Sequence, residues 1–337
     1  MQALLLIPVG GGQFHFGENG LEDSSDLLHS DTLFSALANI YEYALSGAET
    51  FISLVESGRL SFSSGMYALL KQGEMSLLFL PKPVVTYRKS GDRKLHKSLK
   101  YFSLGVLEEF RKSFESQKHE SELDLSVYSS IGNEFLCLAD ELGGMPDEFK
   151  NRSFRRFTTS PKVKVHTTFE DNDRLYHETT VQFNSFAVDG QEYEGAYCVL
   201  FRHDLTDEQY REFLAALRIM ADEGVGGQRS SGKGQFREVR EVTIDIPERE
   251  AVAAYLGLSI VSPADDREFD ALERYEMFVR GGGSLGWRGD SEKHRKQARF
   301  VKEGALLKEN IAGQLVDVSP EADRSILRNG RNFAIPI

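Results

Sequence analysis

Hydrophobic and polar positions along the chain follow two periods, one typical of helices and one typical of strands. Helical spacing occurs at 31–45, where apolar residues recur three and four positions apart, and again at 206–223. Shorter runs have the character of strands, and these cover residues 3–9, 77–80, 162–169, 175–188, 196–202 and 236–246. Strands and helices mixed in this way along one chain predict an α+β fold.

A glycine-rich loop follows the second helical segment and reads GVGGQRSSGKGQF over residues 224–236. The helix before it opens with a Thr206/Gln209 capping box and stops at Gly224. Glycines reach positive φ without a Cβ clash, so successive amide groups can turn toward one anion and form a nest. The candidate phosphate contacts in this loop are Gly224, Gly226, Gly227, Gln228, Arg229, Ser230, Ser231, Gly232, Lys233 and Gly234.

Two other interpretations of the loop remain open. Residues 227–233 match a nucleotide-binding P-loop up to its last position, where Gly234 replaces the hydroxyl residue that holds Mg²⁺. The order helix, loop, strand is also the reverse of a P-loop, so no helix N-terminus faces the anion. The other alternative is a surface connection without a ligand. Arg229 and Lys233 within the turn favour anion binding.

The net charge is -12 at pH 7, but the charges are unevenly distributed. Residues 82–100 are rich in Lys and Arg and contain one acid, and residues 150–166 are basic with no acid at all. This pattern predicts separate basic and acidic faces, and an ordinary solvated surface is the alternative for either run. As part of an RNA track, the two runs contribute the candidate residues Arg88, Lys89, Arg93, Lys94, Lys97, Arg155 and Arg156.

The first basic run is predicted to form an insertion that projects from the body of the protein. Its two extended arms would flank Ser90-Gly91-Asp92 and span residues 82–101. Such a projection would present its cations to a nucleic acid.

The segment His29-Ser30-Asp31-Thr32 precedes an apolar helical run. A histidine beside a carboxylate suggests a catalytic pair. Hydroxyl and carboxylate side chains at a helix start nevertheless accept hydrogen bonds from amides that have no other partner, so capping is the preferred interpretation. Contact with an RNA phosphate is compatible with that role for His29 and Ser30.

The remaining composition narrows the class of protein. Cys137 and Cys198 are the only cysteines and lie in apolar stretches, which argues against a disulfide framework and for a reducing cytoplasm. The histidines lack the spacing of metal ligands, so no metal or cofactor is expected. The apolar run 3–9 is too short for a membrane span, and the length of 337 residues suits about two domains.

Several segments together resemble the RAMP superfamily of CRISPR RNA-binding proteins, and within it the subunit 4 family of the type III-A (Csm) complex. The glycine loop after a helix is one of them. The others are HSDTLFSAL at 29–37, YEMFVRGG at 275–282 and SILRNGRNFAIPI at 325–337. They occur in the family's order and span nearly the whole chain.

The resemblance implies an architecture of two ferredoxin-like units related to the RRM fold. The first would cover residues 1–240, with the glycine loop and the basic insertion, and the second residues 241–337. Arg280, inside YEMFVRGG, becomes a further candidate for RNA contact.

The resemblance also implies a non-catalytic subunit that binds the 5′ tag of the mature CRISPR RNA (crRNA). Its partners would be the crRNA, the target RNA in the assembled complex, the large palm-domain subunit and the backbone RAMP subunit, with no membrane. The basic insertion would act as the thumb that interrupts the guide and target duplex. The rival is a RAMP endoribonuclease that cuts repeat RNA without metal, with His15 or His29 as general base.

Overall fold

The structure is a computed structural model that describes residues 1–17, 22, 24–88, 93–115, 120–164, 174–246, 252–284, 293–320 and 325–337. Its helices are α1 (Ser30–Ala44), α2 (Ala48–Glu56), α3 (Arg93–Ser98), α4 (Leu104–Ser113), α5 (Pro146–Phe149), α6 (Asp207–Glu223), α7 (Asp266–Asp270) and the 3₁₀ turns η2 (Leu125–Val127), η3 (Asp140–Leu142) and η4 (Arg229–Ser231). Its first sixteen strands are β1 (Gln2–Pro8), β2 (Gln13–Phe14), β3 (Leu60–Phe62), β4 (Met66–Lys71), β5 (Glu74–Pro81), β6 (Thr86–Tyr87), β7 (Tyr101–Ser103), β8 (Phe114–Glu115), β9 (Glu120–Ser121), β10 (Ser129–Ile131), β11 (Phe135–Cys137), β12 (Arg155–Lys164), β13 (Arg174–Phe183), β14 (Ser185–Val188), β15 (Gln191–His203) and β16 (Phe236–Thr243). The remaining strands are β17 (Tyr255–Gly257), β18 (Leu272–Arg274), β19 (Met277–Arg280), β20 (Gly283–Ser284), β21 (Lys293–His294), β22 (Ala298–Val301), β23 (Leu306–Leu307), β24 (Gly313–Asp317), β25 (Leu327–Arg331) and β26 (Ala334–Pro336).

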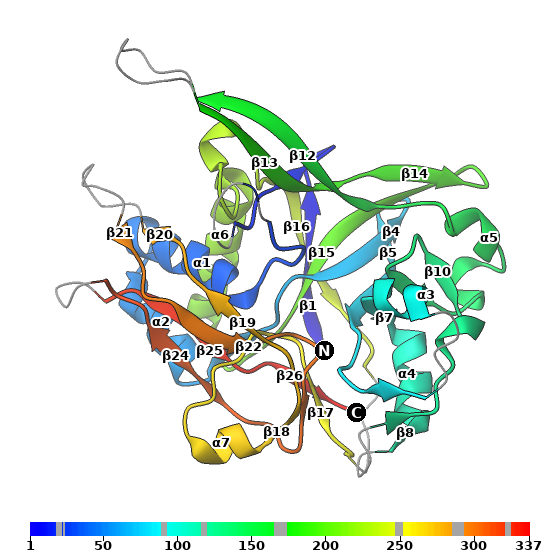
Figure 1. Cartoon of the computed structure of the whole chain (residues 1–337). Coiled ribbons are helices and arrows are strands. Elements are labelled where there is room, and N and C mark those ends of the chain that lie inside the picture. Colours follow the sequence, from blue (N-terminus) through cyan, green and yellow to red (C-terminus); the bar gives the residue numbers. More distant parts are fainter. Residues whose placement is uncertain are drawn as a thin grey trace.

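A large mixed sheet forms the centre of the molecule (Figure 1). Its strand order is β10-β11-β7-β5-β4-β15-β1-β16, with β3 and β14 also paired to β15. At the heart of the sheet β16, β1, β15 and β4 are antiparallel neighbours, and α1 follows β1 while α6 connects β15 to β16. If β1, β4, β15 and β16 are numbered 1 to 4 in chain order, they lie side by side in the order 4-1-3-2. The chain therefore has a mixed α+β fold.

The two faces of the sheet are covered by different parts of the chain, and β1 shows why. Successive side chains of a strand point to opposite faces. Leu4 and Leu6 belong to the core that contains α1, α2 and α6. Leu5 and Ile7 belong to a second core, shared with α4 and with the strands β17 and β26 near the C-terminus. A strand buried on both faces reads as a continuous apolar run, as residues 3–9 do.

The main sequence predictions of secondary structure are confirmed. The predicted helices 31–45 and 206–223 are α1 and α6, and the Thr206/Gln209 capping box is formed as expected. The predicted strands 3–9 and 236–246 correspond to β1 and β16. The described parts of the other predicted strands also lie in strands: β5, β12, β13 with β14, and β15.

The second ferredoxin-like unit, predicted for 241–337, is not what the described residues there form. They contain one helix, α7, of five residues, whereas a βαββαβ unit requires two helices packed on its sheet. Instead, short strands build the sheet β18-β23-β17-β26 and the hairpins β19–β22 and β24–β25. Buried residues of β17 and β26 join the core below the central sheet, so this part covers a face of the sheet rather than standing apart.

The projecting insertion predicted for 82–101 is also not formed by its described residues. Tyr87 and Leu99 are buried in the core, and β6 pairs with β9 against the body of the protein. The Lys82 amide donates to the Lys100 carbonyl oxygen at 2.8 Å, which closes the segment at its base. Burying its apolar side chains in the core is favourable, whereas a projection would leave them in water. Residues 89–92 lie outside the described part of the chain.

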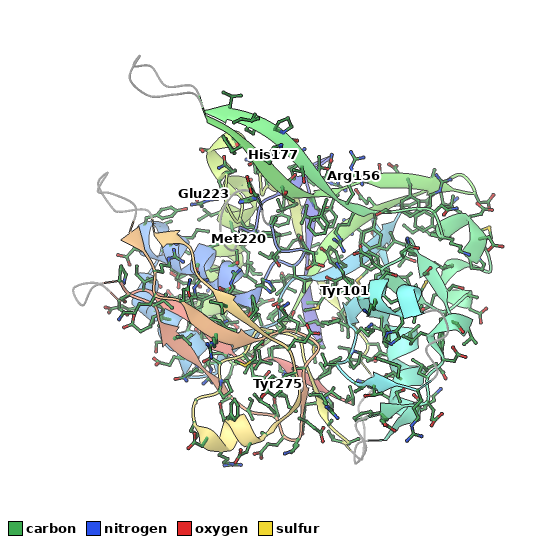
Figure 2. The ribbon with its side chains drawn as sticks, viewed as in Figure 1. Tyr101, Arg156, His177, Met220, Glu223 and Tyr275 are labelled. Atoms are coloured by element: carbon green, nitrogen blue, oxygen red, sulfur yellow. The ribbon has the colours of Figure 1, made fainter. Side chains whose placement is uncertain are left out.

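A different segment projects from the body: the antiparallel pair β12 and β13 (Figure 1). We call this pair the arm. β2 pairs with the base of β13, and Figure 2 shows Arg156 and His177 on the arm. Phe157, Val163 and Leu175 are apolar and exposed along it.

Arg155 lies at the base of the arm and is only 2% exposed, which argues against the predicted RNA contact at this position. Its Nη2 lies 2.7 Å from the Glu134 carboxylate and 3.8 Å from Asp26. The guanidinium carbon also lies 5.0 Å from the Tyr67 ring centroid. Burial opposes ionisation of Asp26, but Arg155 and Lys100 outweigh it and hold the pKa of its carboxyl below its usual value.

We expect Arg155→Met to lower the free energy of unfolding by about 3 kcal/mol, because it leaves Asp26 and Glu134 without their buried cation. The matched control is Arg156→Met, an exposed neighbour whose loss should change stability by less than about 0.5 kcal/mol. Urea unfolding of both variants measures the difference. Equal stability of the two variants would contradict the structural role of Arg155.

Candidate nucleic-acid interface

The glycine loop closes on itself between α6 and β16. Gly224 ends α6 with φ 86°, and the Val225 amide donates to the Gly234 carbonyl oxygen at 3.0 Å. A Cβ on Gly224 would lie 2.6 Å from the Lys233 carbonyl oxygen, and one on Gly234 would overlap the Val225 backbone. Both glycines are therefore required by the close approach of the two ends of the loop.

The same loop is hydrogen-bonded to the segment around β2. The Gly227 amide donates to the His15 carbonyl oxygen at 2.8 Å, and the Gly234 amide donates to that of Gln13 at 2.9 Å. Gly226, at φ 89°, leaves no room for a Cβ against His15. Several amides that the sequence offered to a phosphate are thus used inside the protein.

The amides left to an anion stand on the outer turn of the loop. Within the described residues, no hydrogen bond occupies the amides of Gly226, Gln228, Arg229 and Ser230. Gln228 adopts the left-handed conformation at φ 60° and leads into η4, a turn of the kind that directs neighbouring amides to one side. Ser231 is exposed and bonds back to Gln228, and Gly232 faces open space.

The two cations of the loop have different environments. Arg229 is exposed, with its guanidinium 3.7 Å from the Glu223 carboxylate. Lys233 is 12% exposed at its side chain and pairs with the buried carboxylate of Glu178 on the arm. Lys233 therefore ties the loop to the arm, and Arg229 is the loop cation that faces outward.

Asp31 is fully buried and joins the start of α1 to the C-terminal part of the chain. Its Oδ1 lies 2.9 Å from Nη2 of Arg280, and its Oδ2 pairs with Arg328 and lies 3.1 Å from Nε of Arg280. Burial opposes ionisation, but Arg280 and Arg328 outweigh it and hold the pKa of the Asp31 carboxyl below its usual value. The side-chain capping expected at this helix start is absent, because His29 is the N-cap and forms no cap bond.

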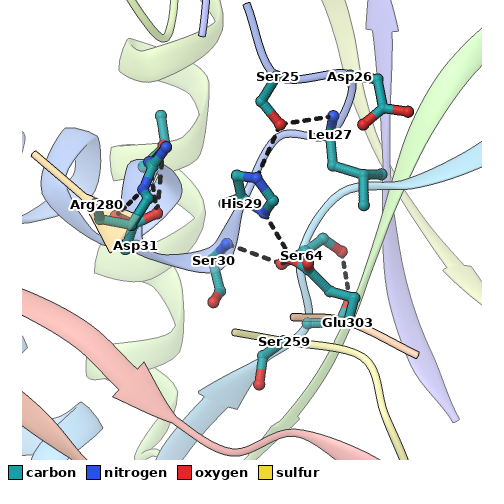
Figure 3. Close-up of polar contacts among 12 residues, drawn as sticks. Ser25, Asp26, Leu27, His29, Ser30, Asp31, Ser64, Ser259, Arg280 and Glu303 are labelled. Carbon is teal, nitrogen blue, oxygen red and sulfur yellow. Dashed lines mark hydrogen bonds and ion pairs between the residues drawn. The ribbon is translucent and has the colours of Figure 1, made fainter. Parts of the chain in front are cut away.

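His29 and Ser30 are buried, which argues against the predicted RNA contact of Ser30, whereas His29 also lines a pocket that contains Lys82. His29 is 5% exposed, and its ring nitrogens bond to Ser25 Oγ and to Glu303 Oε1, each at 2.8 Å (Figure 3). The Ser30 amide donates to Ser64 Oγ at 2.9 Å, and Ser64 in turn bonds to Glu303. This second polar cluster also connects the start of α1 to the C-terminal part.

A pocket of about 270 Å³ opens between the glycine loop and these arginines, and we call it the loop pocket. Its walls include Gly226, Arg229, Arg280, Arg295 and Arg328. A phosphate fits such a wall because guanidinium groups bind it with two parallel hydrogen bonds.

Among the described residues no carboxylate forms an ion pair with Arg295, and Asp31 offsets its charge only in part. Its Nε is buried and has no hydrogen-bond partner among the described residues. Burial, together with the neighbouring Arg328 and Arg280, lowers the pKa of Arg295, and Asp31 opposes this only in part. Three guanidinium groups thus share one buried carboxylate, and an entering anion would relieve their repulsion.

The other predicted contacts do not gather at this pocket. Arg88 pairs with Glu120 and Glu122, and Lys97 is exposed on α3. Arg156 lies on the arm and bonds to Gln182. Lys89 lies outside the described residues, as do the side chains of Arg93 and Lys94. Of all the predicted residues, only the glycine loop and Arg280 meet there.

Sequence reasoning missed Arg295 and Arg328. Arg295 belongs to a third basic run, Lys293 to Lys296, which is a signal of the same kind as the two runs that were considered. Arg328 has no comparable signal, because it stands among apolar and amide residues. Only its pairing with a carboxylate almost 300 positions away reveals its place.

The described part of the chain lacks both a metal-binding cluster and a membrane-spanning helix. It holds no group of three or more His, Cys, Asp or Glu residues placed to bind a metal ion. None of the helices in these residues has the length and apolar character needed to cross a membrane.

The chain belongs to the RAMP superfamily, which residues 9–237 match. Residues 250–337 match the CRISPR Csm4 C-terminal domain. Among curated relatives, the CRISPR system Cms protein Csm4 of Methanocaldococcus jannaschii is 24% identical over 360 residues, covering 96% of this chain and 90% of that protein. The protein of the same description from Streptococcus thermophilus is 23% identical over 315 residues, covering 91% of this chain and 89% of its own.

Solved structures share the fold along the whole chain. A chain in the crystal structure of a Csm3-Csm4 subcomplex of the type III-A CRISPR-Cas interference complex aligns with a TM-score of 0.66 at 18% identity, covering 100% of this chain and 99% of that one. A chain of a Csm1-Csm4 cassette in complex with cA4 aligns with a TM-score of 0.55 at 17% identity, covering 100% and 97%. At these identities the likeness establishes the fold.

We expect Asp31→Asn to cost about 3 kcal/mol of stability at neutral pH, because it leaves two buried guanidinium groups without their carboxylate. The folded-state pKa of Asp31 lies below its unfolded value of about 3.9. Its contribution is therefore complete above that pH and is lost as the pH falls through the folded pKa. Unfolding free energies measured across this range should show the gap between wild type and variant closing in acid. A gap that is independent of pH would contradict the assignment.

Gly234→Ala and Gly232→Ala form a matched pair for the loop. Both positions have positive φ, which costs an alanine about 1 kcal/mol or more. Only Gly234 also faces a backbone contact, with Val225, whereas Gly232 faces open space. We expect a clearly larger drop in Tm for Gly234→Ala. Similar values for the two would show that loop closure does not require this glycine.

Proposed function

We propose that the chain is an RNA-binding subunit of a type III-A CRISPR interference complex and holds the 5′ tag of the crRNA in the loop pocket. The observation that supports this most is the meeting of the glycine loop with Arg280, Arg295 and Arg328, which come from the opposite end of the sequence. The free amides of Gly226 and Arg229, which line this pocket, and its arginines suit a phosphodiester.

A single-stranded RNA suits the site better than a duplex. The pocket has room for about one nucleotide, and it is lined by groups that bind phosphate rather than read paired bases. Binding through the backbone also explains how an acidic protein holds RNA, because the local charge at the pocket is positive while the acids lie elsewhere.

The arm is the better candidate for the thumb that the sequence assigned to 82–101. It projects from the body, and it exposes Phe157, Val163 and Leu175 beside the cation of Arg156. Apolar and aromatic side chains on a projection can pack against unstacked bases. We infer that the arm meets the paired guide and target RNA, and Lys233 with Glu178 couples it to the glycine loop.

The proposed partners of the chain follow from its relatives. Chains of the same fold occur in a Csm3-Csm4 subcomplex and in Csm1-Csm4 cassettes. We propose that this chain likewise docks on a backbone RAMP subunit and on a large palm-domain subunit, in the cytoplasm. A functional division near residue 240, with one ferredoxin-like unit before it, is part of the proposal and is supported by the strand order around β1.

The hydrogen bonding of His29 favours a binding role over the endoribonuclease alternative. A general base needs a free ring nitrogen within reach of the proton that it removes. Both ring nitrogens of His29 are bonded. His15 is buried, with its Nδ1 bonded to the Thr179 carbonyl oxygen at 2.8 Å, but it lines the loop pocket, so it is the histidine that a cleavage assay tests.

We expect Arg229→Met together with Arg295→Met to weaken binding of tag RNA and to flatten its salt dependence. Each lost phosphate contact should reduce the slope of log K against log salt by about 0.7. Fluorescence anisotropy with labelled tag RNA over a salt series measures both quantities. Arg267→Met is the control, because Arg267 is exposed on α7 and pairs with Glu309.

Three outcomes of this experiment are informative. Loss of affinity and slope in the double variant alone supports the loop pocket. Unchanged affinity and slope would remove the pocket from the RNA path. Shortened RNA with a 2′,3′-cyclic phosphate end, formed in EDTA by the wild type, would favour the endoribonuclease instead.

A further inference from the structure

A second and larger pocket, of about 560 Å³, lies along the same seam between the two ends of the sequence. We call it the lysine pocket. Its walls come from Ser25 to Leu27 and His29 near the start of the chain, from residues 81–85, 87, 96, 97 and 99–101, and from Glu276, Lys302 and Glu303. The hairpin β19–β22 separates it from the loop pocket, since Glu276 precedes this hairpin and Arg280 ends its first strand.

The lysine pocket contains cations that form no ion pair with a carboxylate of the described residues. Lys82, Lys97 and Lys302 have no carboxylate within ion-pair distance among the described residues. The fourth lysine, Lys100, forms ion pairs: its Nζ lies 3.4 Å from Asp26 Oδ2 and 3.0 Å from Glu134 Oε1.

The acids of this pocket leave a positive balance. The wall holds four lysines, Lys82, Lys97, Lys100 and Lys302, against three carboxylates, Asp26, Glu276 and Glu303. Glu303 also bonds to His29 and Ser64. Burial lowers the pKa of Lys82, and Glu276 opposes this shift without cancelling it. A bound anion would favour the charged form of this ammonium.

The rest of the wall is apolar and aromatic. Pro81, Pro83, Val84 and Val85 line it, together with the buried Leu99. Tyr87 and His96 meet edge to face with ring centroids 5.3 Å apart, and Lys82 Nζ lies 5.8 Å from the Tyr87 centroid.

One polar atom of this wall lacks a partner. His96 Nε2 is buried without a hydrogen bond among the described residues. An apolar wall with one free ring nitrogen and nearby ammonium groups fits a nucleobase with its phosphate.

The hairpin between the two pockets has one inner and one outer face. Phe278 packs on His29, with ring centroids 5.2 Å apart, and Arg280 pairs with Asp31, so these two side chains face inward. Met277 and Val279 alternate with them and are exposed. The five residues from Glu276 to Arg280 span about 13 Å at the usual rise of a strand. The hairpin therefore forms a short apolar ridge with an electropositive pocket at each end.

We propose that the lysine pocket is a second nucleotide site, occupied by another nucleotide of the same RNA strand that enters the loop pocket. This inference rests on the proposed function. The strand crosses the apolar ridge of β19 with bases against Met277 and Val279, and the lysines hold a phosphate on the far side. Recognition at two separated points sets both the direction and the register of the bound RNA.

The test compares tag RNA fragments shortened one nucleotide at a time, measured with the full chain by anisotropy over a salt series. We expect Lys82→Met with Lys302→Met to weaken long fragments and to reduce their salt slope by about 0.7 for each phosphate contact that is lost. Fragments too short to cross the ridge should bind the variant and the wild type equally. Lys308→Met is the matched control, because Lys308 is exposed and its ammonium donates to the Asp270 carbonyl oxygen, away from both pockets.

Each outcome decides the matter. A loss confined to long fragments supports the second site. An equal loss for all lengths, or no loss at any length, overturns it. Normal RNA binding by a variant that no longer co-purifies with its complex would assign the pocket to a protein contact instead. The proposed function fails separately, if the wild type binds no tag RNA of any length.

Discussion

A single buried carboxylate, that of Asp31, determines how the two ends of this chain meet. It stands in the first turn of α1 and binds two guanidinium groups that belong to β19 and β25. Burying three charges is favourable only when they are closely paired, and here two cations share one anion. The pairing therefore fixes the C-terminal strands against α1 and leaves the surrounding space electropositive. Both pockets lie along the seam that this contact closes.

The glycine loop forms the wall of the loop pocket that lies opposite these C-terminal arginines. Its glycines are required by contacts inside the protein: Gly224 and Gly234 by the closure of the loop, and Gly226 by its approach to His15. The amides that remain free belong to the outer turn, and of its residues Gly226 and Arg229 line the loop pocket with the arginines. The loop contributes geometry and free donors, and the C-terminal part contributes most of the charge. Neither segment alone forms the site.

The sequence predicted best what depends on local patterns. The periodicity of α1 and α6, the Thr206/Gln209 cap and the two-sided burial of β1 all follow from neighbouring residues. Long-range contacts could not be predicted from the sequence. The residues next to Asp31 in the sequence predict that it caps the helix. The two arginines that pair with it lie about 250 and 300 positions away, so no local pattern reveals them. The basic run at 82–100 resembled a projection because its charges are visible in sequence, whereas the burial of Tyr87 and Leu99 is visible only in the fold.

The surplus of positive charge in the loop pocket connects stability to function. Burial and the neighbouring Arg328 and Arg280 lower the pKa of Arg295, and Asp31 opposes this only in part, so the positive charges of the described residues repel one another there. A hydrophobic residue in its place would remove that repulsion, and the pocket would then lose a cation that an anion needs. Residues that bind ligands often cost stability in the free protein for this reason. Arg295 is thus better explained by an anion that enters the pocket than by the packing of the chain itself, and the same reasoning applies to the partly buried ammonium of Lys82 across the β19 ridge.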